Sequence, residues 1–258
     1  MLATASQIRG TIQTFVRGFC AQKSATHPYE FAKIGDVWVM RDAVRKNPRY
    51  YRKEEWIAYG TPAAEVDIIA RRQTRGRFFV CAVRGMEESD EKLRASYKEI
   101  GYRLMATEPL FVHRLKTIPR AASPAVIERV ASEDMARRFG KASRSRPIPI
   151  EQFGKDAPFR QYVALESEEI VGWVRSIDAG GSNWVANMYV RPKSRRRGIG
   201  MALLTKMLRD DKKRGAKQSV LLSSHTGALV YPRVGYEQIG MLYIYAPRKG
   251  PARQAGPT

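Results

Sequence analysis

The residues best suited to chemistry in this sequence form a short basic turn with two glycines. Arg195, Arg196 and Arg197 are followed by Gly198, and Gly200 stands two positions later. An apolar run precedes this turn and a helical pattern follows it, so several backbone N–H groups at the helix start lack an intrahelical acceptor. Those donors and the helix dipole predict a cradle for an anion such as a phosphate. A side chain at either glycine would hold the phosphate away from the backbone.

Two other phosphate-binding loops are excluded by the same segment. The turn does not end in Gly-Lys-Ser or Gly-Lys-Thr, which the loop of nucleotide triphosphatases requires. Leu203 stands where the dinucleotide-binding fingerprint has a third glycine or alanine. Neither a triphosphatase site nor a dinucleotide site is therefore expected here.

The elements before the turn must position it. Apolar, β-forming runs span residues 162–165, 170–174 and 184–190, and short turn-rich segments separate them. This pattern predicts an antiparallel meander. From Ile199 onward, apolar residues recur at helical spacing and predict an amphipathic helix.

Further elements complete a mixed α/β domain. We expect a strand at 219–222, a short helix at 227–234 and a last strand at 241–245. The predicted order from the first run is therefore β-β-β-α-β-α-β.

The turn and its context resemble the GNAT acetyltransferase superfamily. The family signature Arg/Gln-x-x-Gly-x-Gly/Ala is matched by Arg195, Gly198 and Gly200. A Tyr-x-x-x-Gly-Tyr pattern that starts at Tyr231 stands where the family usually carries Tyr-x-x-x-Gly-Phe. The resemblance covers about residues 125–247. It implies an α/β (α+β) fold with a mixed, mostly antiparallel sheet flanked by helices.

The resemblance also implies acetyl-CoA as cofactor. The pyrophosphate would rest on the amides that open the helix, and the pantetheine arm would run along strand 188–190. A backbone N–H near Met188 or Tyr189 would polarise the thioester carbonyl. The cofactor-binding residues implied in this way are Met188, Tyr189, Val190, Arg195, Arg196, Arg197, Gly198, Ile199, Gly200 and Met201.

The implied reaction is N-acetylation of a primary amine, on a small molecule or a protein, by direct attack through a tetrahedral intermediate. The departing thiolate needs a proton, and Tyr231 occupies the family's position for supplying it. A core-packing role for Tyr231 is the alternative, because Pro232 departs from the family pattern. Strand 184–190 contains no acidic residue, so the general base stays open among Glu166, Ser223 and water relays.

Residues 117–124 are rich in proline and small side chains and predict a linker between two domains. We expect an N-terminal α/β domain at 1–116, a GNAT domain at 125–247 and a disordered tail at 248–258. The Tyr-x-x-x-Gly-Tyr pattern also occurs at Tyr97, which suggests that the first half is a degenerate GNAT-like copy. A chance match is the alternative. The first half lacks the signature between a strand and a helix, so we expect no cofactor site there.

Composition narrows the function classes. Two cysteines and three histidines are scattered without ligand spacing, so no metal site is expected. No run of about 18 apolar residues and no signal-peptide pattern occurs, which predicts a cytoplasmic protein without a membrane partner. The formal charge of +21 favours the binding of polyanions.

The alternative function is thus a catalytically inactive GNAT-fold protein that binds nucleic acid or acts as a scaffold. Nucleic acid is not favoured as a partner, because no recognised nucleic-acid motif occurs.

Overall fold

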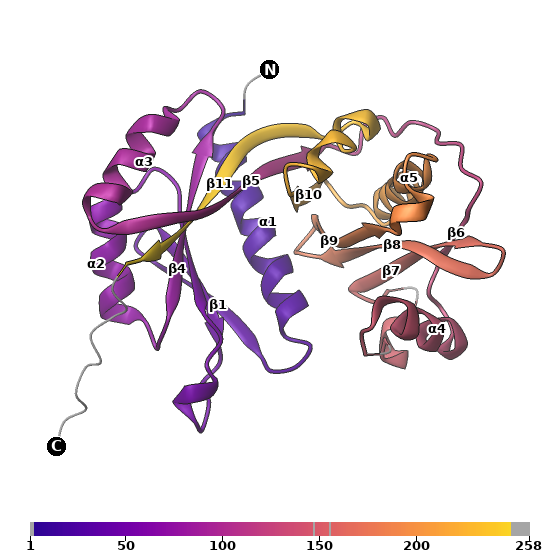
Figure 1. Cartoon of the computed structure of the whole chain (residues 1–258), viewed down its shortest axis with the longest axis horizontal. Helices are drawn as coiled ribbons and strands as arrows, with labels where there is room; N and C mark the ends of the chain where they lie inside the picture. Colours follow the sequence, from indigo (N-terminus) through magenta and orange to yellow (C-terminus); the bar gives the residue numbers. More distant parts are fainter. Residues whose placement is uncertain (1–2, 147, 155, 249–258) are drawn as a thin grey trace. The chain divides into compact units, whose positions relative to one another are not determined.

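The computed structural model describes residues 3–146, 148–154 and 156–248, which form two compact units (Figure 1). Unit 1 holds the chain up to Leu110 and again from Ile239, and unit 2 holds Phe111 to Gln238. The tail that we predicted to be disordered lies outside the described residues from position 249 onward. The predicted fold class, a mixed and mostly antiparallel sheet flanked by helices, is confirmed.

Unit 1 places α1 on one face of its strands and α2 and α3 on the other (Figure 1). Its strands follow the order β1-β2-β3-β4-β11-β5. An apolar stripe of α1, formed by Ile8, Ile12 and Phe15, is buried because these residues recur at helical spacing. The elements are α1 (Ala5–Lys23), β1 (Tyr29–Ile34), β2 (Val37–Asp42), η1 (Pro48–Tyr50), β3 (Glu54–Ala58), α2 (Ala63–Gln73), β4 (Phe78–Gly85), α3 (Asp90–Glu99), β5 (Tyr102–His113) and β11 (Glu237–Pro247).

Strand β11 joins the end of the chain to unit 1. It pairs antiparallel with β4, from Gly240 opposite Gly85 to Tyr245 opposite Val80. A Cβ at Gly240 would lie 2.5 Å from the carbonyl oxygen of Arg84, so only glycine permits this approach. The predicted domain 125–247 includes this strand, whereas the compact units place it with the N-terminal part. Hydrophobic periodicity indicates a strand but carries no information on its partner.

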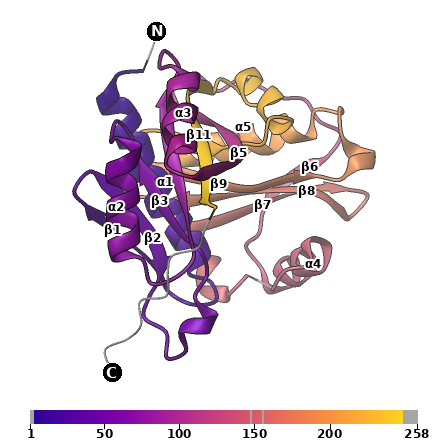
Figure 2. The ribbon, with the colours of Figure 1, turned by 60° about the vertical axis from the view of Figure 1, so that its left-hand side comes forward.

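Unit 2 packs α5 on one face of its strands and α4 on the other (Figure 2). Tyr162 and Ala164 of β7 face the core beneath α5, and Val163 and Leu165 face the core beneath α4, as alternation along a strand requires. The strands follow the order β10-β9-β8-β7-β6. The elements are β6 (Val126–Arg129), α4 (Glu133–Ser143), η2 (Ile150–Gln152), β7 (Phe159–Glu166), β8 (Glu169–Asp178), β9 (Asn183–Val190), η3 (Pro192–Ser194), α5 (Ile199–Lys213), β10 (Ser219–Leu222), η4 (Gly227–Leu229) and η5 (Pro232–Val234).

The predicted meander and amphipathic helix are confirmed as β7, β8, β9 and α5. The short helix predicted at 227–234 is wrong in type, because two 3₁₀ turns, η4 and η5, occupy this segment. Pro232 has no N–H to donate to a preceding carbonyl, so an α-helix cannot continue through it.

The two Tyr-x-x-x-Gly-Tyr segments share two geometric features, the packing of their tyrosine rings and the conformation of their glycine. The rings of Tyr97 and Tyr102 lie 5.7 Å apart at 77°, and those of Tyr231 and Tyr236 lie 5.6 Å apart at 75°. The glycine of each copy has a positive φ, 82° in the first and 97° in the second. The first copy begins in an α-helix and the second at a 3₁₀ turn. A chance match of letters, however, does not require the same ring packing and the same positive φ at the glycine. The structure therefore favours an internal repeat.

Candidate active site

The basic turn between β9 and α5 presents a run of free backbone N–H groups. The amides of Ser194 and Arg195 bond back across η3, and the amide of Ala202 makes the first bond of α5, to Gly198. No acceptor among the described residues takes the N–H groups of 196–201. We call these six groups the amide cradle. Consecutive free amides at the start of a 15-residue helix are suited to bind a phosphate or diphosphate.

Close packing around the turn accounts for its two glycines, Gly198 and Gly200. Arg196 and Gly198 have positive φ of 61° and 78°, which reverses the chain before α5. A Cβ at Gly198 would lie 2.6 Å from the carbonyl oxygen of Ala122. A Cβ at Gly200 would lie 3.2 Å from the Cε of Met188. Both glycines thus permit close internal contacts, in addition to the approach of a phosphate that the sequence suggested.

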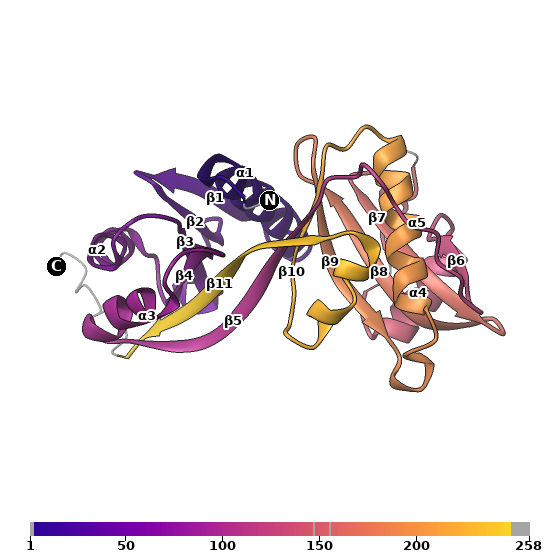
Figure 3. The same ribbon diagram turned by 90° about the horizontal axis from the view of Figure 1, so that it is seen from above.

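The segment predicted as a linker lies along α5 (Figure 3). Carbonyls of this segment and of the preceding Lys116 contact the helix every three residues. The oxygen of Lys116 accepts a bond from Lys212 at 2.7 Å, and that of Pro119 accepts one from Arg209 at 2.8 Å. The oxygen of Ala122 reaches the glycine that caps the helix. A three-residue repeat is typical of extended, proline-containing chain, which here fixes the turn that bears the amide cradle.

The three arginines of the turn have different partners. Arg195 donates to the last carbonyl of β9 at 2.9 Å, and Arg197 forms an ion pair with Glu166 at 2.9 Å. Glu166 also accepts a bond from Ser194 at 3.1 Å. Arg196 has no ion pair or hydrogen bond with a described residue. Glu166 therefore anchors the turn, and Arg196 leaves positive charge exposed at the amide cradle. Because Glu166 is already bonded to Arg197 and Ser194, it is a poor candidate for the general base.

Strand β9 separates from β10 where the implied pantetheine site begins. In the described part of the chain the two strands pair only at Asn183 with Ser219 and at Trp184 with Val220. Beyond this point Asn187 has a φ of 53°, and the β8–β9 register shifts by one residue, which marks a β-bulge. The bulge interrupts the strand pairing at the position where the sequence placed the carbonyl-binding N–H.

The side chains of the implied pantetheine strand divide between core and solvent. Met188 and Val190 are half-buried against the core beneath α5. Tyr189 points the other way, is 37% exposed and stacks on Trp173 with ring centres 4.6 Å apart. These residues therefore position the strand by packing, and their backbone is what a ligand could use.

Tyr231 lies in the turn between η4 and η5. It is buried, and its ring packs 5.6 Å from that of Phe111. Burial raises the pKa of Tyr231 to about 12, although a hydrogen bond with Ser223 opposes this shift. A methyl of Val230, the preceding residue, would lie 3.9 Å from a Cβ at Gly200, so the tyrosine's own segment reaches the first turn of α5. The structure thus brings the proposed acid and the amide cradle into the same unit.

Other residues of unit 2 contribute less to the site. Trp184 is buried and His225 is exposed. The Ser223 hydroxyl donates to the carbonyl of Ser224 at 2.7 Å. Within residues 3–146, 148–154 and 156–248, no three His, Cys, Asp or Glu side chains are grouped so that they could hold a metal ion. No helix in these ranges has the length and apolarity needed to cross a membrane.

Comparison with known proteins agrees with this geometry. Residues 158–238 match the family model described as "Acetyltransferase (GNAT) domain". A GCN5-related N-acetyltransferase from Kribbella flavida is 16% identical, with a TM-score of 0.62, and the match covers 93% of this chain and 96% of that one. A GCN5-related N-acetyltransferase from Sphaerobacter thermophilus is 17% identical, with a TM-score of 0.52, and the match covers 91% of this chain and 90% of that one.

A tandem GNAT protein from the clavulanic acid biosynthesis pathway is 12% identical, with a TM-score of 0.51, and the match covers 100% of this chain and 98% of that one. No match to a curated protein reached significance. The predicted GNAT resemblance is confirmed, and the similarity in fold extends over nearly the whole chain.

Proposed function

We propose that this chain, which carries a GNAT acetyltransferase domain at residues 158–238, transfers an acetyl group from acetyl-CoA to a primary amine. The observation that carries the proposal is the amide cradle, six unpaired N–H groups at the start of a long helix. The fold supports acyl transfer in general, whereas the choice of acetyl-CoA and of an amine acceptor belongs to the proposal. The proposed cytoplasmic location rests on the sequence alone.

The described residues fit the cofactor in two places. The amide cradle would hold the pyrophosphate, with Arg196 as the cation that has no other described partner. The edge of β9 from Met188 to Val190, which lies beyond its pairing with β10, would bind the pantetheine arm through its backbone. This intact anion site supports an enzyme over the alternative of an inactive nucleic-acid-binding or scaffold protein. When bound, acetyl-CoA would supply the activated acyl carbon and a thiolate leaving group.

Two groups of the chain would assist the reaction. A backbone N–H near Met188 or Tyr189 would donate to the carbonyl oxygen as it gains negative charge. Tyr231 would donate its phenolic proton to the departing sulfur, because its raised pKa keeps it protonated at neutral pH. No carboxylate lies on β9, so the amine would lose its proton to water or to another group.

Titration of the full chain with acetyl-CoA tests the proposal directly. We expect saturable binding by isothermal titration calorimetry, with a Kd in the micromolar range that is common for such ligands. S-acetyl-pantetheine, which lacks the pyrophosphate, should bind at least about tenfold more weakly, because it cannot use the amide cradle. If millimolar acetyl-CoA gives no heat of binding in calorimetry and no increase in the Tm, the proposal is wrong.

Tyr231→Phe separates the chemical role of this residue from binding. We expect turnover to fall about 10- to 100-fold while the Kd for acetyl-CoA stays near normal, because one proton donor is lost and packing is kept. In the unmodified protein the raised pKa of Tyr231 means that it should not produce an alkaline decline in kcat below about pH 10. Equal losses of binding and turnover, or unchanged turnover, would show that Tyr231 only packs.

A further inference from the structure

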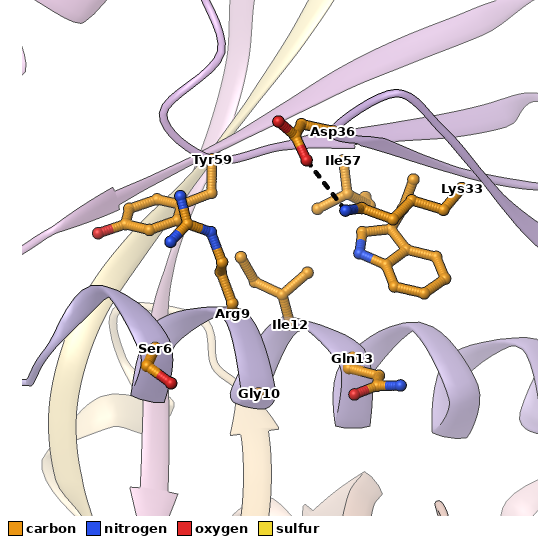
Figure 4. A pocket seen from close by; sticks show the side chains of 10 residues that line it. Ser6, Arg9, Gly10, Ile12, Gln13, Lys33, Asp36, Ile57 and Tyr59 are labelled. Carbon is orange, nitrogen blue, oxygen red and sulfur yellow. Dashed lines mark hydrogen bonds and ion pairs between the residues drawn. The ribbon is translucent and has the colours of Figure 1, made fainter.

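Unit 1 contains a pocket of about 360 Å³ between α1 and the three strands that face it (Figure 4). Its floor is apolar and includes Ile12 of α1 and Ile57 of β3, both almost fully buried. The rings of Trp38 and Tyr59 form part of the wall. The volume is in the range of sites for small ligands, and polar and charged side chains make up about half of the lining around the apolar floor.

Gly10 of α1 lies at the solvent-exposed edge of the pocket. Gly10 lines the pocket, and a Cβ built there would have no atom within 4 Å. On the opposite wall, Lys33, Trp38 and Ile57 are register partners on β1, β2 and β3, so they stand in a row on one face of the sheet. Lys33 is exposed and Trp38 is half-buried, so the helix leaves part of this row uncovered.

One cation of the lining, Arg9, forms no ion pair or hydrogen bond with a described residue. Arg9 points toward Tyr59 (Figure 4), and its guanidinium carbon lies 5.6 Å from the centre of that ring. The other two charged side chains of the lining form an ion pair with each other, with 3.0 Å between the Nζ of Lys33 and the Oδ1 of Asp36, so their charges largely cancel. The charged lining residues Arg9, Lys33 and Asp36 therefore sum to one positive charge beside the apolar floor. The hydrogen bond with Lys33 lowers the pKa of Asp36, and Asp36 lies close enough to Arg9 for that charge to lower it further.

We infer that this pocket binds a small organic anion, a carboxylate attached to a flat apolar body, through Arg9 and the Trp38 wall. A guanidinium presents two parallel N–H donors that match a carboxylate, and the ring of Tyr59 holds it in place. The flat body would pack between Trp38 and the isoleucine floor and leave water. This site shares no residue with the amide cradle or with Tyr231, so it goes beyond the proposed acyl transfer.

The inference is tested on the full chain with indole-3-acetate as probe and indole as its neutral counterpart. We expect calorimetry to detect indole-3-acetate with a Kd at least about tenfold lower than that of indole, because only the acid uses the guanidinium. Arg9→Gln should remove this preference, and Arg9→Lys should keep part of it, since the charge remains without the planar fork. Equal binding of the two probes, or no binding of either at millimolar concentration, would overturn the inference.

Filling the pocket gives a second, independent test. Gly10→Leu adds a side chain in the open space at the edge of the pocket and should weaken indole-3-acetate binding by at least about tenfold. Gly10→Ala is the matched control, because alanine suits the helix better and occupies little of the pocket; it should bind nearly as before with an equal or higher Tm. Both variants should bind acetyl-CoA normally, which separates this inference from the proposed function. Undiminished binding by Gly10→Leu would place the probe elsewhere.

Discussion

Gly198→Asp should lower the affinity for acetyl-CoA by more than about a hundredfold. The new carboxylate would stand in the amide cradle, where like charge against a diphosphate costs several kcal/mol. The backbone of residue 198 has a φ of 78°, and its Cβ would meet the carbonyl of Ala122 at 2.6 Å, so the turn must also shift. Calorimetry on the folded variant measures the loss, and circular dichroism verifies that the variant is folded.

Two control variants separate the causes. Gly198→Asn has nearly the same shape without the charge, and asparagine tolerates positive φ better than most residues. It should therefore bind acetyl-CoA better than Gly198→Asp. Gly215→Ala carries the same backbone strain, with a φ of 81° at the far end of α5, but its Cβ would have no atom within 4 Å. It should lose some stability and keep its affinity. Equal affinity in all three variants would contradict the role of the cradle.

The turn shows what the sequence could predict and what it could not. The basic letters, the two glycines and the change of periodicity at Ile199 predicted a strand, a turn and a helix with free amides, because these features are local. The contact between Gly198 and Ala122 was not predictable, since it joins positions far apart in the chain. The linker prediction recognised residues 117–124 as irregular, but composition carries no information on where an irregular segment packs.

The partners of the strands could not be predicted from the sequence either, because strand pairing also joins positions far apart in the chain. The apolar run near 241–245 predicted a strand correctly, yet its pairing with β4 depends on contacts such as that between Gly240 and Arg84. The bulge at Asn187 was also missed. Asparagine is one of the few residues that adopt positive φ readily, so its position inside an apolar strand pattern was the available signal.

A buried ion pair fixes the other end of α5. Arg160 of β7 and Asp211 of α5 approach to 2.9 Å, with side chains 2% and 0% exposed. The hydroxyl of Ser176 on β8 donates to the same carboxylate at 2.8 Å. This cluster joins the helix to two strands of the meander, whereas the extended segment around Pro119 holds the solvent side of the helix. The start of α5 is therefore positioned by contacts along its whole length.

Arg160→Met should reduce the free energy of unfolding by about 3–5 kcal/mol, the usual cost of leaving one charge of a buried pair without its partner. Urea denaturation measures this loss. Burial raises the pKa of Asp211, and Arg160 opposes that effect. Without Arg160 the pKa of Asp211 in the folded state rises further above its value in the unfolded state. Protonation of Asp211 below that pKa removes its unpaired charge and restores part of the variant's stability. The loss of stability should therefore be larger at pH 8 than at pH 5.

Two further variants decide whether this cost arises from the unpaired carboxylate. Asp210→Asn removes the partner of Lys206 in the more exposed neighbouring pair and should cost less than about 1 kcal/mol. Arg160→Met combined with Asp211→Leu removes both buried charges, and it should recover much of the stability that the single change loses. A double variant no more stable than Arg160→Met would instead assign the loss to packing. In that case the position of α5, and of the amides at its start, would depend on the shape of this cluster rather than on its charge.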